Sequence, residues 1–170
     1  MSLLIAPIAS FDSISLDELN DALVAWGHKM GEWRRPPYRG FFHGLREHGR
    51  LVAVLAAGDL IRETAAGMSR AEAFELGRVC AVRPHLNRVA LRLWREMVFP
   101  DLCRVHGWRW CISYQDAALH SGDLYRFDGW VRLAYSRSGN DHRSGRKGRN
   151  KWVWGWCDDA EARQAKRGQP

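Results

Sequence analysis

Long hydrophobic runs are missing from this chain of 170 residues, and no segment approaches the roughly 20 apolar residues that a membrane helix requires. The N-terminus, MSLLIAPIASFDS, also lacks the basic start and the extended apolar stretch of a signal peptide. We therefore expect a cytoplasmic protein with no membrane partner.

Paired cysteines and clustered histidines are missing as well. The cysteines include no CxxC pair, which excludes zinc-finger spacing, and a cytoplasmic chain has little reason to form disulfides. The spacing of His28, His43 and His48 fits no compact ligand motif, so no metal site is predicted. Each cysteine lies in an apolar segment, and we expect buried thiols at Cys80, Cys103, Cys111 and Cys157.

Acidic residues are outnumbered by basic ones. Lys and Arg total 26 against 19 Asp and Glu, which gives a formal net charge of +7 and a pI near 9.7. The excess is uneven, because residues 137–151 carry many cations and the single acid Asp141. A basic chain favours a polyanionic partner, most commonly nucleic acid. The same run is equally consistent with a flexible, solvated loop.

The order of apolar patterns predicts an α/β or α+β fold with a mixed central sheet flanked by helices. We expect one domain over residues 1–158, with a basic loop at 137–151 and a polar tail at 159–170. The segment Ser15-Leu16-Asp17-Glu18 is a capping box that starts a helix ending near Gly27. Further helices are expected at 87–105 and 120–128, with a helical turn within 58–72. Strands are expected at 3–8, 41–46, 51–57, 74–82, 108–114, 129–135 and 152–156, and those at 41–46 and 51–57 should form a hairpin with its turn at 47–50.

Arg78 lies inside an apolar strand. A buried arginine is costly unless it is paired, so its side chain should face a cleft or meet a carboxylate such as Glu75 or Asp116. We interpret Arg78 as an active-site residue.

Ser113, Asp116 and His120 form a second polar group. Ser113 ends an apolar strand, where the active-site residues of open α/β sheets often lie. A carboxylate beside an imidazole can tune or orient a base, and we name Ser113 and Asp116 as candidate catalytic residues for proton transfer and substrate positioning. The absence of nucleophile-elbow glycines around Ser113 excludes a hydrolase triad. Asp116 can alternatively cap the next helix.

Residues 82–90 join a strand to the long helix and are rich in cations. A helix N-terminus presents free amides and the positive end of a dipole, which suits phosphate. We expect Asn87 to cap this helix, and we name Val82, Arg83, Asn87 and Arg88 as candidate cofactor-binding residues. The alternative is a solvated basic turn.

Two segments interleave cations with aromatic residues, at 33–39 and at 143–156. Cations neutralise phosphates, and aromatic rings can stack on an exposed base. The candidate DNA-binding residues are Arg34, Arg35, Arg143, Arg146, Lys147 and Arg149. The alternation of Trp152, Trp154 and Trp156 also indicates a strand with one buried face.

Several short motifs occur in a characteristic order: ELGRV at 75–79, Asn87 with LRL at 91–93, ISYQD at 112–116, GDLYR at 122–126 and GWV at 129–131. This order resembles the GNAT superfamily of N-acetyltransferases and, more narrowly, the phage Mom DNA-modification proteins. The resemblance covers about a third of the chain. The usual glycines of the pyrophosphate loop are absent from 83–90, a departure that the Mom-like proteins share.

The resemblance implies a catalytic role for Tyr125, since a tyrosine on the helix after the fifth strand commonly protonates the leaving thiolate in this superfamily. It also implies a histidine near the substrate entrance, which corresponds to His28 here. The implied donor is acetyl-CoA or another acyl donor, and the implied partner is double-stranded DNA. The implied activity is modification of the adenine exocyclic amine, which protects phage DNA from restriction. A phage-encoded chain would then act in the host cytoplasm.

Two other functions are compatible with the residues. The first is an acetyl-CoA-dependent transferase that acts on a protein or a small amine and ignores DNA. The second is a DNA-binding module without chemistry, whose binding would survive loss of Tyr125 and Asp116. The missing glycines weigh against the first, and the polar residues after Cys111 weigh against the second.

Overall fold

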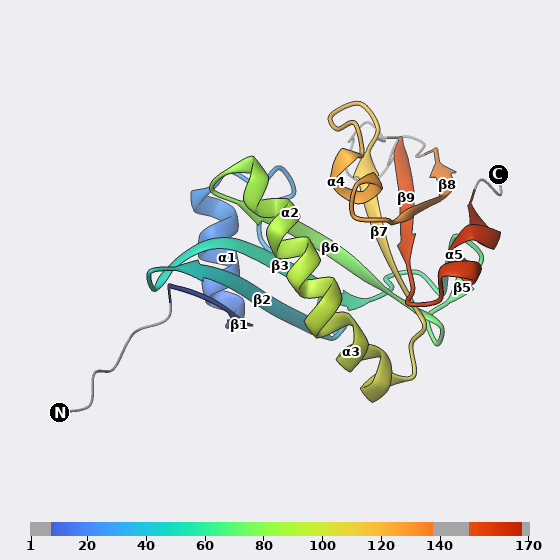
Figure 1. Ribbon diagram of the computed structural model, residues 1–170, viewed down its shortest axis with the longest axis horizontal. Coiled ribbons are helices and arrows are strands. Elements are labelled where there is room, and N and C mark those ends of the chain that lie inside the picture. The colour runs from blue at the N-terminus through green and yellow to red at the C-terminus, as the bar shows by residue number, and fades with distance from the viewer. Residues whose placement is uncertain (1–7, 138–149, 168–170) are drawn as a thin grey trace. The chain divides into compact units, whose positions relative to one another are not determined.

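The computed structural model describes residues 8–137 and 150–167 (Figure 1). The chain divides into two compact units. The first is drawn from residues 1–58 and 77–99, and the second from 59–76 and 100–170. Strand β6 (Ala73–Ala81) belongs to both, because the division falls between Leu76 and Gly77.

In the first unit, helices pack against a group of strands. These strands are hydrogen-bonded to one another in the order β1-β2-β3-β6. Strands β1·β2 and β2·β3 pair antiparallel, and β2–β3 is the expected hairpin. In Figure 1, α2 passes in front of these strands and α1 passes behind them. The elements are β1 (Ala9–Ser13), α1 (Leu16–Ala25), β2 (Gly40–Glu47), β3 (Arg50–Asp59), α2 (Pro84–Leu93) and the π-helical turn η1 (Trp94–Val98).

The second unit orders its main strands β6-β7-β9-β8, with β6·β7 parallel and the other pairs antiparallel. The expected mixed sheet flanked by helices is therefore confirmed. The elements are β4 (Thr64–Ala65), β5 (Met68–Ser69), α3 (Phe99–His106), β7 (Trp110–Asp116), α4 (Asp123–Arg126), β8 (Val131–Ser136), β9 (Lys151–Trp156) and α5 (Ala160–Lys166).

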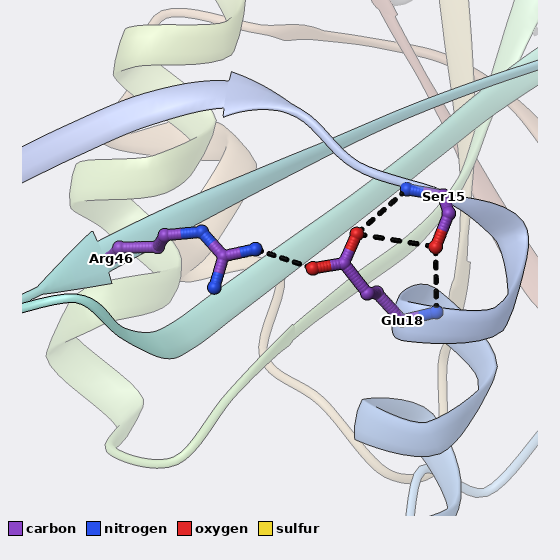
Figure 2. A network of polar contacts seen from close by, with 3 residues as sticks. All are labelled: Ser15, Glu18 and Arg46. Atoms are coloured by element: carbon purple, nitrogen blue, oxygen red, sulfur yellow. Dashed lines mark hydrogen bonds and ion pairs between the residues drawn. The ribbon is translucent and has the colours of Figure 1, made fainter.

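The predicted capping box starts α1, as Figure 2 shows. The Ser15 hydroxyl accepts from the Glu18 amide at 3.1 Å, and the Ser15 amide donates to the Glu18 carboxylate at 3.0 Å. Arg46 of β2 forms an ion pair with the other carboxylate oxygen. The Ser15 amide, followed by Arg46, lowers the pKa of Glu18. One carboxylate thus caps α1 and ties it to the neighbouring hairpin.

Each unit has its own apolar cluster. In the first, Leu19 and Leu23 of α1 pack with Val54 and Ala56 of β3, where the alternate residues of one strand face share the contact. In the second, Trp110 and Ile112 of β7 pack with residues of β8 and β9. The free cysteines are buried except for Cys103, which is half-buried. Burial raises the pKa of every one of these thiols, so all stay protonated near neutral pH.

The helical turn expected within 58–72 is wrong, because this stretch forms the β4–β5 hairpin. Ala66 and Gly67 have φ of 49° and 74° at its turn. Two successive positive φ values are typical of the tight turns that match strand twist. Alanine is rare at such a position, so Ala66-Gly67 is a weaker hairpin signal than Asn-Gly or Asp-Gly.

The long helix begins earlier and is less regular than expected. It starts at Pro84, a residue suited to the first helical position, so Asn87 lies in the first turn and does not cap. The turn widens at η1, where the Phe99 amide donates to the Trp94 carbonyl. The widening lies directly before Pro100, which cannot donate a backbone hydrogen bond.

Three further boundaries differ. The first described strand is Ala9–Ser13, whereas most of the expected strand 3–8 lies outside the described residues. The expected helix 120–128 is shortened to Asp123–Arg126, because Gly122 adopts φ 83° directly before it. The expected polar tail contains α5, whose Asp159 caps the amides of Glu161 and Ala162.

Candidate active site

Ser113 and Tyr125 are brought into direct contact in the second unit. Their hydroxyl oxygens lie 2.7 Å apart, and the Ser113 hydroxyl also donates to the Leu76 carbonyl at 2.7 Å. Ser113 is 2% exposed and Tyr125 is 8% exposed. The sequence named both residues, and the structure adds that they form one buried hydrogen-bonded pair.

The phenol ring of Tyr125 lies between two tryptophans. It stacks on Trp154 with ring centroids 5.7 Å apart and meets the edge of Trp130 at 5.3 Å. Burial raises the pKa of Tyr125 to about 12, while the Ser113 hydrogen bond acts in the opposite direction. The phenol is therefore fully protonated near neutral pH, as a proton donor must be.

Gln115 and Gly122 hold this arrangement in place. The Gln115 side chain accepts from the Trp154 indole at 2.7 Å and donates to the His120 carbonyl. Gly122 has φ 83°, and a Cβ there would lie 2.6 Å from both the Gln115 Oε1 and the Trp154 Cζ2. Sequence reasoning assigned no role to Gln115, Trp154 or Gly122. Two features of the sequence could have indicated them: the amide side chain of Gln115 near the end of an apolar strand, and Gly122 directly before the segment that contains Tyr125.

Asp116 closes the turn that follows β7. Its carboxylate accepts from the Ala118 amide at 3.0 Å, and its carbonyl accepts from the amides of Leu119 and His120. Asp116 therefore shapes a turn, not a helix start, since α4 begins seven residues later at Asp123. The His120 side chain is exposed. A role of Asp116 in proton transfer stays a prediction.

Arg78, in the first unit, is 6% exposed. Its guanidinium donates to the carbonyls of Gly77 at 2.9 Å and of Gly31 and Glu32 at 3.4 Å, and it lies 5.6 Å from the Trp33 ring centroid. Carbonyl oxygens and an aromatic face thus offset the cost of burying this cation. Arg78 holds the loop after α1, and its catalytic role stays a prediction.

The same loop contains other candidate residues. The His28 Nδ1 accepts from the Met30 amide at 3.3 Å, which turns the chain after α1. Arg34 forms an ion pair with Glu32, and Arg35 lies 4.2 Å above the Trp33 ring. The remaining DNA-binding candidates, Arg143, Arg146, Lys147 and Arg149, lie outside the described residues.

The candidate phosphate-binding segment is the start of α2. Val82 and Arg83 are exposed, and the N-cap residue Arg83 makes no side-chain cap. The positive end of the helix dipole suits phosphate oxygens, although Pro84 has no amide hydrogen and the Leu86 amide donates to the Arg83 carbonyl at 3.0 Å. The Asn87 Oδ1 is buried without a hydrogen-bond partner, while Arg88 is exposed. These residues fit a phosphate-bearing cofactor, although Arg83 already pairs with Glu47.

Within residues 8–137 and 150–167, no group of His, Cys, Asp or Glu is arranged to hold a metal ion. Over these ranges, every helix is too short or too polar to cross a bilayer.

Comparison with known proteins gives matches in structure only. No protein-family model and no curated protein matches the sequence. The ribosomal-protein-S18-alanine N-acetyltransferase of Escherichia coli matches with a TM-score of 0.57 at 14% identity, over 88% of this chain and 93% of that one. The aminoglycoside 6'-N-acetyltransferase of Enterococcus faecium matches at 0.56 and 9% identity, over 87% and 96%. A GNAT-family acetyltransferase of Desulfovibrio desulfuricans matches at 0.55 and 16% identity, over 88% and 98%.

At these identities the likeness concerns the fold alone. Nothing in the comparisons supports the narrower resemblance to the Mom proteins. Both the S18-alanine acetyltransferase and the Desulfovibrio protein match over 88% of this chain. The chain therefore has the fold of the GNAT acetyltransferases.

Proposed function

We propose that the protein is an acyl-CoA-dependent N-acyltransferase in which Tyr125 is the general acid. The observation that carries this proposal is the buried, hydrogen-bonded phenol of Tyr125, 2.7 Å from Ser113, in a chain with an acetyltransferase fold. A bound acyl-CoA supplies a thioester whose carbonyl an amine can attack. Tyr125 then gives its proton to the departing sulfur, which avoids the release of a free thiolate.

The start of α2 is the candidate site for the phosphates of the donor. The positive end of the α2 dipole and the cations Arg83 and Arg88 would bind its phosphates, and the unpartnered Asn87 Oδ1 would accept from a donor group elsewhere on the same molecule. Arg83 must loosen its ion pair with Glu47 to do so. Both side chains of that pair are substantially exposed, so exchange of Glu47 for a phosphate costs little.

Donor binding is the first test, because it requires no knowledge of the acceptor. Thermal unfolding is measured with acetyl-CoA, CoA and longer acyl-CoAs, with inorganic phosphate as the control. A ligand at 100 times its Kd stabilises by about 2.7 kcal/mol, which corresponds to a Tm rise of about 5–11 °C for a chain of this size. Absence of a rise with every acyl-CoA at millimolar concentration overturns the proposal.

The acceptor is then sought by following thiol release from acetyl-CoA with a panel of polyamines, peptides with free N-termini, aminoglycosides and nucleosides. Tyr125→Phe keeps the ring packing and removes the proton. The proposal expects this variant to bind the donor normally and to lose most of the turnover, about 100-fold or more. Full turnover by Tyr125→Phe would exclude Tyr125 as the acid.

DNA is the second candidate acceptor, and one group of contacts favours it. Arg132 lies 4.2 Å above the Trp152 ring, and Arg126 lies 4.7 Å above the Phe127 ring, which is 55% exposed. Paired cations and aromatic rings suit phosphates and bases. Nucleosides from plasmid DNA of expressing bacteria would carry a new adenosine-derived mass, absent with Tyr125→Phe. Unmodified nucleosides together with acylated amines would exclude this acceptor.

A further inference from the structure

Ser113 has two hydrogen-bond neighbours but only one hydroxyl proton. Both neighbours lie 2.7 Å away: the Leu76 carbonyl oxygen and the Tyr125 hydroxyl. A carbonyl oxygen can only accept, so the Ser113 proton is directed to Leu76. The bond to Tyr125 must then be donated by the phenol. In the resting protein the two hydrogen bonds are therefore donated in one direction: Tyr125 donates to Ser113, and Ser113 donates to the Leu76 carbonyl.

This direction has a consequence for a general acid. When Tyr125 gives up its proton, its oxygen becomes negative in a place lined by Trp154 and Trp130. A buried anion is costly without a donor. Ser113 is the neighbour that can supply one, because its hydroxyl can rotate away from the Leu76 carbonyl and donate to the phenolate.

We propose that Ser113 is a positioning residue that accepts the Tyr125 hydrogen bond at rest and donates to the Tyr125 oxygen once the phenol proton turns to the departing sulfur during acyl transfer. The proposal rests on the function proposed above. In the transfer the Tyr125 O–H bond breaks as the S–H bond of the departing thiol forms. The Ser113 O–H bond stays intact, and only its hydrogen bond changes partner. The attacking amine loses one proton on acylation, and that proton restores Tyr125 through solvent.

The competing role for Ser113 is purely structural. The β6·β7 register ends at the pair Glu75–Ile112, and the Ser113 side chain makes the next link, to the Leu76 carbonyl. A serine that only joins these strands would affect stability when it is replaced. It would not affect the acidity of Tyr125 or the turnover number of the folded enzyme.

The experiment compares the full-length protein with Ser113→Ala, Ser113→Thr and the control Ser69→Ala. Ser69 also uses its hydroxyl in a hydrogen bond, at 2.7 Å to Glu72, but it lies on β5 and has no contact with the tyrosine pair. All four tyrosines are replaced by 3-fluorotyrosine, and Tyr125→Phe identifies the resonance of the fluorinated Tyr125. Fluorine lowers the pKa of a phenol, which brings the ¹⁹F titration into a pH range where the protein stays folded.

We expect Ser113→Ala to make the Tyr125 label about a tenfold weaker acid. With the amine from the acceptor screen, kcat should fall about 10- to 100-fold at unchanged KM for acyl-CoA. Ser113→Thr should restore both quantities, and Ser69→Ala should change neither. An unchanged titration in folded Ser113→Ala overturns the proposal, and so does a shifted titration with unchanged kcat. If the wild-type protein neither binds nor consumes acyl-CoA, the proposed function has failed and Ser113 is a structural link alone.

Discussion

Gly122→Ala is the substitution that most directly tests how Tyr125 is held. Gly122 has φ 83°, and an added Cβ would lie 2.6 Å from the Gln115 Oε1 and 2.6 Å from the Trp154 Cζ2. Trp154 carries the ring that stacks on Tyr125, and Gln115 holds the Trp154 indole. The methyl group must therefore displace either the tryptophan or its partner.

The cost has two parts that a matched variant can separate. An L-residue in the left-handed region costs about 1–2 kcal/mol, and forcing a methyl group into a packed site costs about 1–3 kcal/mol more. Gly107 follows α3 with φ 75° and would place its Cβ with nothing within 4 Å. Gly107→Ala should therefore be destabilised by the backbone conformation alone, with no steric clash. We expect Gly122→Ala to lose about 2–4 kcal/mol and Gly107→Ala about 1 kcal/mol, after a small gain in both from the stiffer unfolded chain.

Urea denaturation of both variants and the wild-type protein gives these values from the midpoints, provided that the slopes agree. Acyl transfer, once an acceptor is known, should fall in Gly122→Ala and persist in Gly107→Ala, because only the first displaces the rings around Tyr125. Equal losses of stability, or a fully active Gly122→Ala protein, would refute the claim that the absence of a Cβ at Gly122 positions the tyrosine.

Three further predictions concern buried polar groups. Burial lowers the pKa of His43 to about 4, so stability should be lost as pH falls from about 6.5 through 4, on the order of 2 kcal/mol. Urea midpoints measured across this pH range should show that His43→Leu loses less stability on acidification than the wild-type protein. The control variant His85→Gln, at an exposed histidine, should lose as much stability as the wild-type protein. Gln115→Leu removes the acceptor of the Trp154 indole and should cost about 1–3 kcal/mol in the same assay at neutral pH. Because burial raises the pKa of Tyr125 to about 12, the folded protein should lose stability between pH 10 and 12, and Tyr125→Phe should lose less by the same measurement.

Local rules in the sequence predicted much of the fold. The capping box at Ser15 and the hairpin signal at 47–50 each depend on neighbouring residues, and both are confirmed. The errors occur where a distant contact or an unfavoured conformation decides. Ala66 takes positive φ within a tight hairpin, and the α2–η1–α3 helix absorbs Pro100 by widening its turn. The residue patterns of these two segments predicted neither the tight turn nor the widened helical turn.

The candidate site was predicted in part for a similar reason. Ser113 and Tyr125 could be named, Ser113 from its place at a strand end and Tyr125 from its motif, but their mutual contact joins residues that are twelve positions apart. Arg78 was expected to face a cleft or to meet a carboxylate, and its guanidinium donates to the Gly77 carbonyl and to two carbonyls of the loop after α1. Backbone acceptors leave no side-chain signature, so a sequence gives no indication of them.

The residues that support Tyr125 explain why the reaction is easier to infer than the acceptor. Ser113, Gln115 and Trp154 come from β7 and β9, and each restrains the phenol or its neighbour through a hydrogen bond or a ring contact. Under the proposed function, restraints of this kind would fix where the Tyr125 proton is delivered, and any amine that attacks the thioester would need that delivery. In that proposal, acceptor choice would depend on other surfaces, such as the exposed cations and rings at Arg132 and Phe127. A substitution there should change which amine reacts while it leaves the acidity of Tyr125 unaltered.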